Sequence, residues 1–138
     1  MTNVDNLYTK LWKSLIQPER LHYYVEDLQP QYYNSTNGEA FKRFDFEVKT
    51  ILKDTLAVSL FLPYNKTTDQ LKRKTDVVIY MHTHNGMRIQ GQSILVPVMN
   101  LGFGVCLFDF HGNGMSSGDY VTFGWTEVLD LDSVSTLK

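Results

Sequence analysis

The alternation of apolar and polar positions first predicts an amphipathic helix near the N-terminus. The apolar residues that recur there at helical spacing are Leu7, Leu11, Trp12, Leu15 and Ile16. Pro18 ends this pattern, and we expect the apolar face of the helix to pack on the body of the domain. Residues 19–42 are mixed and rich in aromatic side chains, and they predict an irregular segment.

A β-hairpin is predicted after this segment. Residues 44–48 alternate apolar and polar side chains, which is typical of a half-buried strand. A second strand covers residues 56–62 and is expected to end at Pro63. The polar pair Lys53-Asp54 fits the turn between the two strands, and residues 63–75 predict a polar loop.

The C-terminal half predicts alternating strands and helices. Four segments make up this part: a strand at 77–82, a helix at 88–101, a strand at 104–110 and a helix at 124–137. Both strands are nearly all apolar, as expected of strands that are covered on both faces. The order of helix, hairpin and then β-α-β-α predicts the α/β class, with a sheet joined by right-handed crossovers.

Length, charge and cysteine content narrow the class further. The 138 residues suffice for one domain, which we divide into an N-terminal lead-in at 1–42 and an α/β part at 43–138. The net charge of −2 gives no basic field for nucleic acid, and no apolar stretch is long enough to span a membrane. The lone Cys106 excludes a disulfide framework and suits a reducing compartment, which favours a cytoplasmic location.

Two pairs of polar residues follow the predicted strands and suggest one type of chemistry. These residues are His82, His84, Asp109 and His111. Residues i and i+2 share a face of an extended chain, and neutral imidazoles with a carboxylate suit zinc or iron. A small metal-dependent hydrolase is therefore one alternative at this stage.

A formal match to a serine nucleophile motif occurs at Gly114-Met115-Ser116-Ser117-Gly118. The nucleophile elbow places its Ser directly between a strand and a helix. Here the strand ends near Phe110, so Ser116 lies about six residues too late for that geometry. The catalytic order of the motif is Ser, acid, His, and no histidine follows His111. These observations favour a loop serine.

Several segments together resemble one family. Residues 82–88 are similar to its His-Gly-Asn loop, and residues 109–116 are similar to its Asp-x-Arg-Gly-x-Gly-x-Ser loop after the fourth strand. Residues 12–23 and the hairpin resemble the opening of larger members, and residues 118–131 continue the pattern. Over about residues 12–137 the chain thus resembles the α/β-hydrolases, in particular the serine aminopeptidase-like and monoglyceride-lipase-like members.

The resemblance implies an N-terminal part of an α/β-hydrolase sheet, incomplete because residue 138 precedes the nucleophile elbow. Complete relatives cleave esters or amides through a serine acyl-enzyme without a cofactor or a metal. It also implies that the His84 N–H is an oxyanion-hole donor. The family has Gly where this chain has Thr83, and a β-branched Thr resists the positive φ that Gly permits. Because nucleophile, acid and base His are absent, we expect no activity from this chain alone.

An incomplete sheet also predicts an exposed strand. In the family, a further strand pairs with the one at 77–81, so these residues are expected to form an open apolar edge through which the chain could self-associate. Three hypotheses therefore stay open: a hydrolase cut short, which would act on a small-molecule ester or amide; a non-catalytic remnant that serves as a binding or assembly module; and the metal enzyme.

Overall fold

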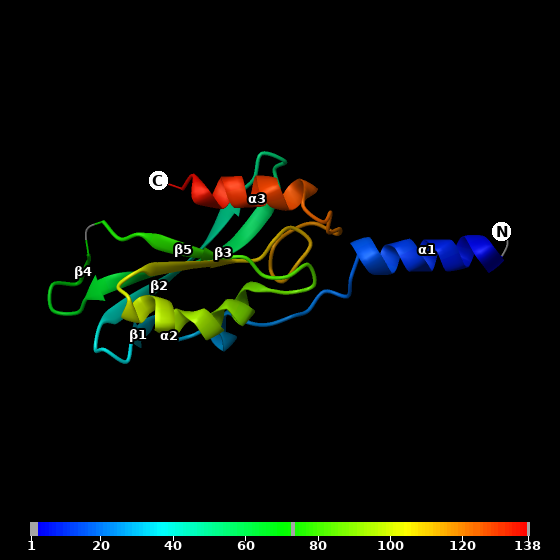
Figure 1. The fold of residues 1–138 in the computed structure, drawn as a ribbon. Helices are drawn as coiled ribbons and strands as arrows, with labels where there is room; N and C mark the ends of the chain where they lie inside the picture. Colours follow the sequence, from blue (N-terminus) through cyan, green and yellow to red (C-terminus); the bar gives the residue numbers. More distant parts are fainter. Residues whose placement is uncertain (1–2, 73, 138) are drawn as a thin grey trace.

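A mixed sheet with one helix on each face forms the body of the molecule (Figure 1). The computed structural model describes residues 3–72 and 74–137. The helices are α1 (Asn3–Ile16), α2 (Gln92–Asn100) and α3 (Trp125–Ser135), with short 3-10 helices η1 (Val25–Asp27) and η2 (Arg88–Gly91). The strands are β1 (Tyr32–Asn34), β2 (Ala40–Lys49), β3 (Thr55–Asn65), β4 (Gln70–Leu71), β5 (Val77–Tyr80) and β6 (Gly104–Phe108).

The strand order β1-β2-β3-β6-β5 combines antiparallel and parallel pairs. The predicted hairpin is confirmed: β2 and β3 pair antiparallel, and Lys53 adopts a positive φ of 68° in the turn between them. β5 and β6 pair in parallel through the crossover helix α2. Gly102, with a φ of 85°, follows α2 and turns the chain toward β6.

Two apolar clusters fill the space between the sheet and its helices. One contains Val134 of α3 together with Leu56, Val58 and Phe108 of the sheet. The other contains Leu95 and Met99 of α2 together with Phe41, Phe61, Val105 and Leu107. The side chains alternate between these two clusters along β3 and β6, as the period of two in a strand requires. The two helices therefore cover opposite faces of the sheet (Figure 1).

Three predictions about the elements were wrong. Residues 19–42 are not wholly irregular, because β1 pairs with the start of β2 at residues 40–42. Pro63 does not end its strand: β3 continues to Asn65, and the Pro63 carbonyl accepts the Lys72 N–H at 3.1 Å. Proline lacks a backbone N–H but keeps its carbonyl acceptor. A strand can therefore include it where the edge that the missing N–H would face makes few hydrogen bonds. The 63–75 loop accordingly contains the short strand β4.

β5 forms an edge of the sheet. Within the described residues it pairs only with β6, and Val77 and Val78 are 39% and 37% exposed. The expectation of a strand covered on both faces was therefore wrong for β5, whereas it was correct for β6, which is buried throughout. The open apolar edge itself is as expected.

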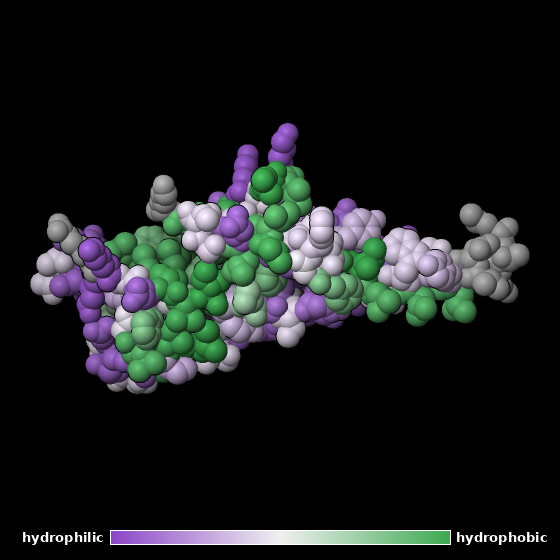
Figure 2. All heavy atoms as spheres, turned by 45° about the horizontal axis from the view of Figure 1, so that its top comes forward, coloured by the Kyte–Doolittle hydropathy of each residue, from purple (hydrophilic) through white to green (hydrophobic). Residues whose placement is uncertain are grey.

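Helix α1 projects away from the body (Figure 1). It ends at Ile16, before Pro18, as predicted. Its apolar face was expected to pack on the domain, and this was wrong: Leu7, Leu11 and Leu15 are exposed. Figure 2 shows apolar side chains along one side of the projecting helix. None of the helices in the described part has the length and apolar character that a membrane crossing requires.

Candidate functional site

Two loops that leave adjacent parallel strands form the candidate site. β5 and β6 pair in register from Val77 with Gly104 to Tyr80 with Leu107, so they end at the same edge of the sheet. The loop after β5 covers residues 81–87, and the loop after β6 begins at Asp109. In an open α/β sheet the carboxyl ends of the strands are where ligands bind.

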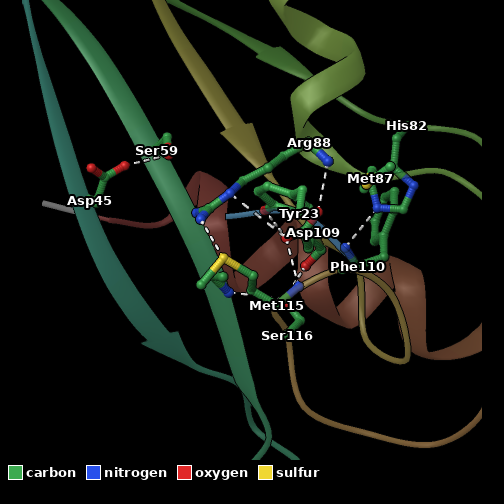
Figure 3. Close-up of polar contacts among 12 residues, drawn as sticks. Tyr23, Asp45, Ser59, His82, Met87, Arg88, Asp109, Phe110, Met115 and Ser116 are labelled. Carbon is green, nitrogen blue, oxygen red and sulfur yellow. Dashed lines mark hydrogen bonds and ion pairs between the residues drawn. The ribbon is translucent and has the colours of Figure 1, made fainter. Parts of the chain in front are cut away.

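The Asp109 carboxylate connects three parts of the chain (Figure 3). Its Oδ1 accepts the Arg88 N–H at 2.7 Å, and its Oδ2 accepts the Met115 N–H at 3.0 Å and the Tyr23 hydroxyl. Asp109 is fully buried, and the Arg88 Nε lies 3.7 Å from its Oδ2. A buried carboxylate requires such donors and a countercharge, so Asp109 holds both loops and the N-terminal lead-in together.

A glycine makes the close approach to this carboxylate possible. Gly114 adopts a φ of 47°, and a Cβ at this position would lie 2.4 Å from the Asp109 Cγ. Any side chain would therefore collide with the carboxylate. The glycine that suggested a nucleophile elbow instead allows the loop after β6 to wrap around Asp109.

His82 is buried and joins the two loops. Its Nε2 accepts the Phe110 N–H at 2.9 Å, which leaves the proton on Nδ1, and Nδ1 donates to the Thr83 carbonyl at 2.6 Å. Burial lowers the pKa of His82, although the Thr83 carbonyl and the Asp109 charge partly offset this effect. The imidazole is therefore neutral and structural.

The next histidine has a different environment. The side chain of His84 is exposed, its Nε2 lies 3.1 Å from the Leu15 carbonyl at the end of α1, and its ring stacks on Phe123 at 4.6 Å. Within residues 3–72 and 74–137 the His84 backbone N–H donates to no backbone carbonyl. Thr83 is not among the residues with positive φ, so the loop keeps a conformation that a β-branched residue tolerates.

A hollow of about 190 Å³ lies beside His84. Its lining consists of His82, His84, Phe110, Asn113, Phe123, Gly124 and Glu127. The lining thus combines the two loops with the start of α3. It includes four rings, two of histidine and two of phenylalanine. This hollow is the space that a ligand at the ends of β5 and β6 would enter.

Comparison with solved structures identifies the architecture. No protein-family model and no curated protein sequence matches the chain. Two crystal forms of the Pyrococcus furiosus esterase Pf2001 match it with a TM-score of 0.56 and 24% identity. The match covers 69% of this chain and 34% of the esterase chain in one form, and 68% and 35% in the other. The fold is part of an α/β-hydrolase fold.

The chain therefore covers about a third of the length of the esterase that it matches. At this level of identity the likeness concerns the fold. It agrees with the hydrolase resemblance of the sequence at the level of the fold. In open α/β sheets the crevice outside the carboxyl ends of the strands is where ligands bind.

Ser116 does not have the geometry of a nucleophile elbow. Its hydroxyl is buried, accepts the Ala57 N–H at 2.9 Å and donates to the Asp109 carbonyl. The elbow needs a Ser on a sharp turn directly between strand and helix, whereas α3 begins only at Trp125. Ser116 is thus a loop serine, as the sequence indicated, and it attaches the loop to β3.

The four residues of the metal hypothesis do not come together. His82 and Asp109 are committed to the bonds above, the His84 ring stacks on Phe123, and the His111 Nδ1 lies 3.3 Å from Asp54. In the described part of the chain, no three His, Cys, Asp or Glu side chains are arranged to hold a metal ion. The i, i+2 spacing failed as an indicator because the chain leaves the strand conformation after Tyr80.

Sequence reasoning missed several residues of the site. Tyr23 and Arg88 were assigned no role, although a buried aspartate at a strand end requires donors from elsewhere. Nothing in the sequence indicated that Phe123 belongs to the site. Its position there depends on a left-handed backbone, which the sequence does not predict for an aromatic residue. Glu127 lies in the segment 118–131 that carries the resemblance but was assigned no role, although its place three residues after Gly124 is the spacing of a capping box.

Proposed function

We propose that this chain is the N-terminal part of a serine aminopeptidase-like or monoglyceride-lipase-like α/β-hydrolase. In its complete form this enzyme cleaves a small-molecule ester or amide through a serine acyl-enzyme. The observation that carries the proposal is that, within the described residues, the His84 N–H donates to no backbone carbonyl, while His84 lines a hollow at the ends of two adjacent parallel strands. The lone buried Cys106 supports a reducing, cytoplasmic location.

In this proposal His84 contributes its backbone N–H to the oxyanion hole. A donor of this kind stabilises the charge that develops on the substrate carbonyl oxygen, and the loss of one costs about 10²–10³ in rate. The Leu15 carbonyl and the Phe123 ring hold the side chain of His84, while His82 and Asp109 hold the loops on either side. The donor is therefore preorganised before a substrate binds.

The remaining chemistry would come from residues beyond these 138. Ser116 is engaged on both sides, and no histidine follows His111 in the sequence. We therefore propose that the chain alone, with its lead-in at 1–42 and its hydrolase part at 43–138, has no serine-hydrolase activity. No cofactor or metal is required in this mechanism, since acyl transfer needs only the triad and the oxyanion donors.

Hydrolysis of p-nitrophenyl acetate by the purified chain tests this proposal. The expected rate equals that of the double variant Ser116→Ala, His84→Ala, and a serine-directed fluorophosphonate probe leaves the chain unlabelled. A rate clearly above that of the double variant, or labelling that Ser116→Ala abolishes, would show that the chain carries its own nucleophile.

A second candidate function, assembly through the open edge, rests on β5. Its Val77 and Val78 and the following Met81 are partly exposed, and an unpaired apolar edge is a template for pairing with another chain. We expect self-association of the chain in sedimentation, reduced by Val78→Lys because a charge on an edge opposes pairing. Ile51→Lys, in the exposed turn between β2 and β3, is the control. A monomeric wild-type chain would exclude this function.

A further inference from the structure

Phe123 has an unusual backbone conformation at the rim of the hollow. Its φ of 55° lies in the left-handed region, which residues with a Cβ rarely adopt. Its ring is largely exposed, yet it stacks on His84 with an interplanar angle of 20°. Strained residues of this kind persist only where their surroundings fix them, and they cluster at functional sites.

The Glu127 carboxylate supplies this constraint from both sides of Phe123. Its Oε1 accepts the Thr122 N–H at 2.8 Å, and its Oε2 accepts the Thr122 hydroxyl at 2.6 Å and the Gly124 N–H at 2.8 Å. The residues before and after Phe123 are thus held by one carboxylate. Gly124, with a φ of 118°, allows the sharp turn into α3.

The hollow behind Phe123 is small and apolar. Besides Phe123 and His84, the rings of Phe110 and the neutral His82 line it, and these two rings pack edge to face at 5.0 Å. Its 190 Å³ is comparable to the roughly 150 Å³ of an apolar cavity that holds one benzene molecule. Because Glu127 also lies in the lining, an anionic ligand is disfavoured.

We propose that Phe123 and His84 limit this hollow to a short, uncharged acyl group, which makes Phe123 the residue that determines substrate size. Glu127 is the positioning residue that holds Phe123 in place. This inference rests on the proposed hydrolase function, since it names the acyl class of the ester that the complete enzyme would take. Phe123 does no chemistry: its largely exposed ring lines the hollow and stacks on His84.

Binding of uncharged ketones to the full chain tests the inference without any catalysis. The probes are 2-pentanone, which has the size of a short acyl ester, and 2-nonanone, and the readout is the amide shifts of His84, Asn113 and Phe123. We expect saturable shifts with 2-pentanone and weaker binding of 2-nonanone. In Phe123→Gly the ratio of the two dissociation constants, which measures the preference for the shorter ketone, should fall about tenfold, because one well-packed aromatic contact is lost.

Phe123→Gly is suited to this test because Gly adopts the left-handed conformation without strain, so the variant is expected to fold. Glu127→Gln is the second variant: an amide offers one acceptor oxygen where the carboxylate offers two, so it cannot accept both the Thr122 N–H and the Gly124 N–H, which bind different oxygens of Glu127. It should lose the size preference although Phe123 is present. Trp125→Ala, which removes an 80% exposed ring that is not part of the lining of the hollow, should keep the wild-type preference.

Three results would overturn the inference. The first is that the wild-type chain shows no saturable shifts at the hollow. The second is that Phe123→Gly and Glu127→Gln both keep the size preference. The third is that tetramethylammonium binds more tightly than 2-pentanone. The last would make the hollow a cation site. These outcomes are independent of the proposed function, because ketone binding is measured in a chain that is expected to be inactive.

Discussion

The hydroxyl of Tyr23 donates a hydrogen bond to the buried carboxylate of Asp109. This contact joins the N-terminal lead-in to the loop after β6, across 86 positions of the sequence. Burial and the Asp109 charge both raise the pKa of Tyr23, so the phenol stays protonated and remains a donor. The lead-in is therefore part of the support of the candidate site.

Tyr23→Phe should destabilise the protein. It removes the hydroxyl and leaves one lone pair of the buried Asp109 without a donor, which costs about 1–3 kcal/mol. Urea unfolding of the wild type and the variant measures this difference. Tyr24→Phe is the control, since Tyr24 is largely exposed and should change the unfolding free energy little. Equal stability of all three proteins would mean that the lead-in contact contributes nothing.

Asp109→Asn should be more severe. The amide carries no charge for the buried Arg88, and its NH₂ group would face backbone donors that now bind the carboxylate. Loss of one member of a buried pair costs about 3–5 kcal/mol. Thermal unfolding of the variant beside Asp119→Asn, an exposed aspartate, checks this. A small shift for Asp109→Asn would disprove the role of its carboxylate in joining the loops.

Mild acid should weaken the fold through His82. Its folded-state pKa is below the ordinary 6.5, because burial opposes the charged form. In the unfolded chain His82 becomes protonated near pH 6.5, whereas in the folded protein it stays neutral to a lower pH. The unfolding free energy therefore decreases as the pH falls below 6.5. His82→Gln, whose oxygen can still accept the Phe110 N–H, should reduce this dependence. Identical pH profiles of the two proteins would contradict it.

Leu11→Lys should leave the stability of the protein nearly unchanged. Leu11 is 63% exposed on the projecting helix, and surface changes typically alter stability by less than about 0.5 kcal/mol. Leu56→Ala, at a fully buried position between the sheet and α3, should cost about 2–5 kcal/mol. Chemical unfolding compares the two variants. A large loss with Leu11→Lys would show that α1 packs on the body in solution.

Much of the fold could be predicted from local pattern. The hairpin, α2, α3 and the two parallel strands each carry a period or an apolar run that tertiary contacts reinforce. Strand β1 was missed because its three residues have no period of their own and, in the part of the chain that the structure describes, pair only with β2. The position of α1 was missed because an amphipathic stripe shows that a face is apolar, but not what covers it.

The candidate site was less predictable. The two loops were found because polar and glycine residues follow apolar strands, yet the assignment of bonds to Asp109 and His82 depends on contacts far apart in sequence. The metal hypothesis failed for the same reason: residue type and spacing suggested ligands, whereas each side chain has another partner. The roles of Phe123 and Glu127 follow from backbone geometry that the sequence does not show.

We propose that these residues form the oxyanion side of a larger serine hydrolase. Capture of the native protein with an antibody against this region, followed by fluorophosphonate labelling and intact-mass measurement, tests it most directly. We predict a labelled species of about 30–40 kDa, the size of a full single domain, with the label on a serine outside these 138 residues. An unlabelled species at the 16.0 kDa of this chain would contradict the hydrolase account.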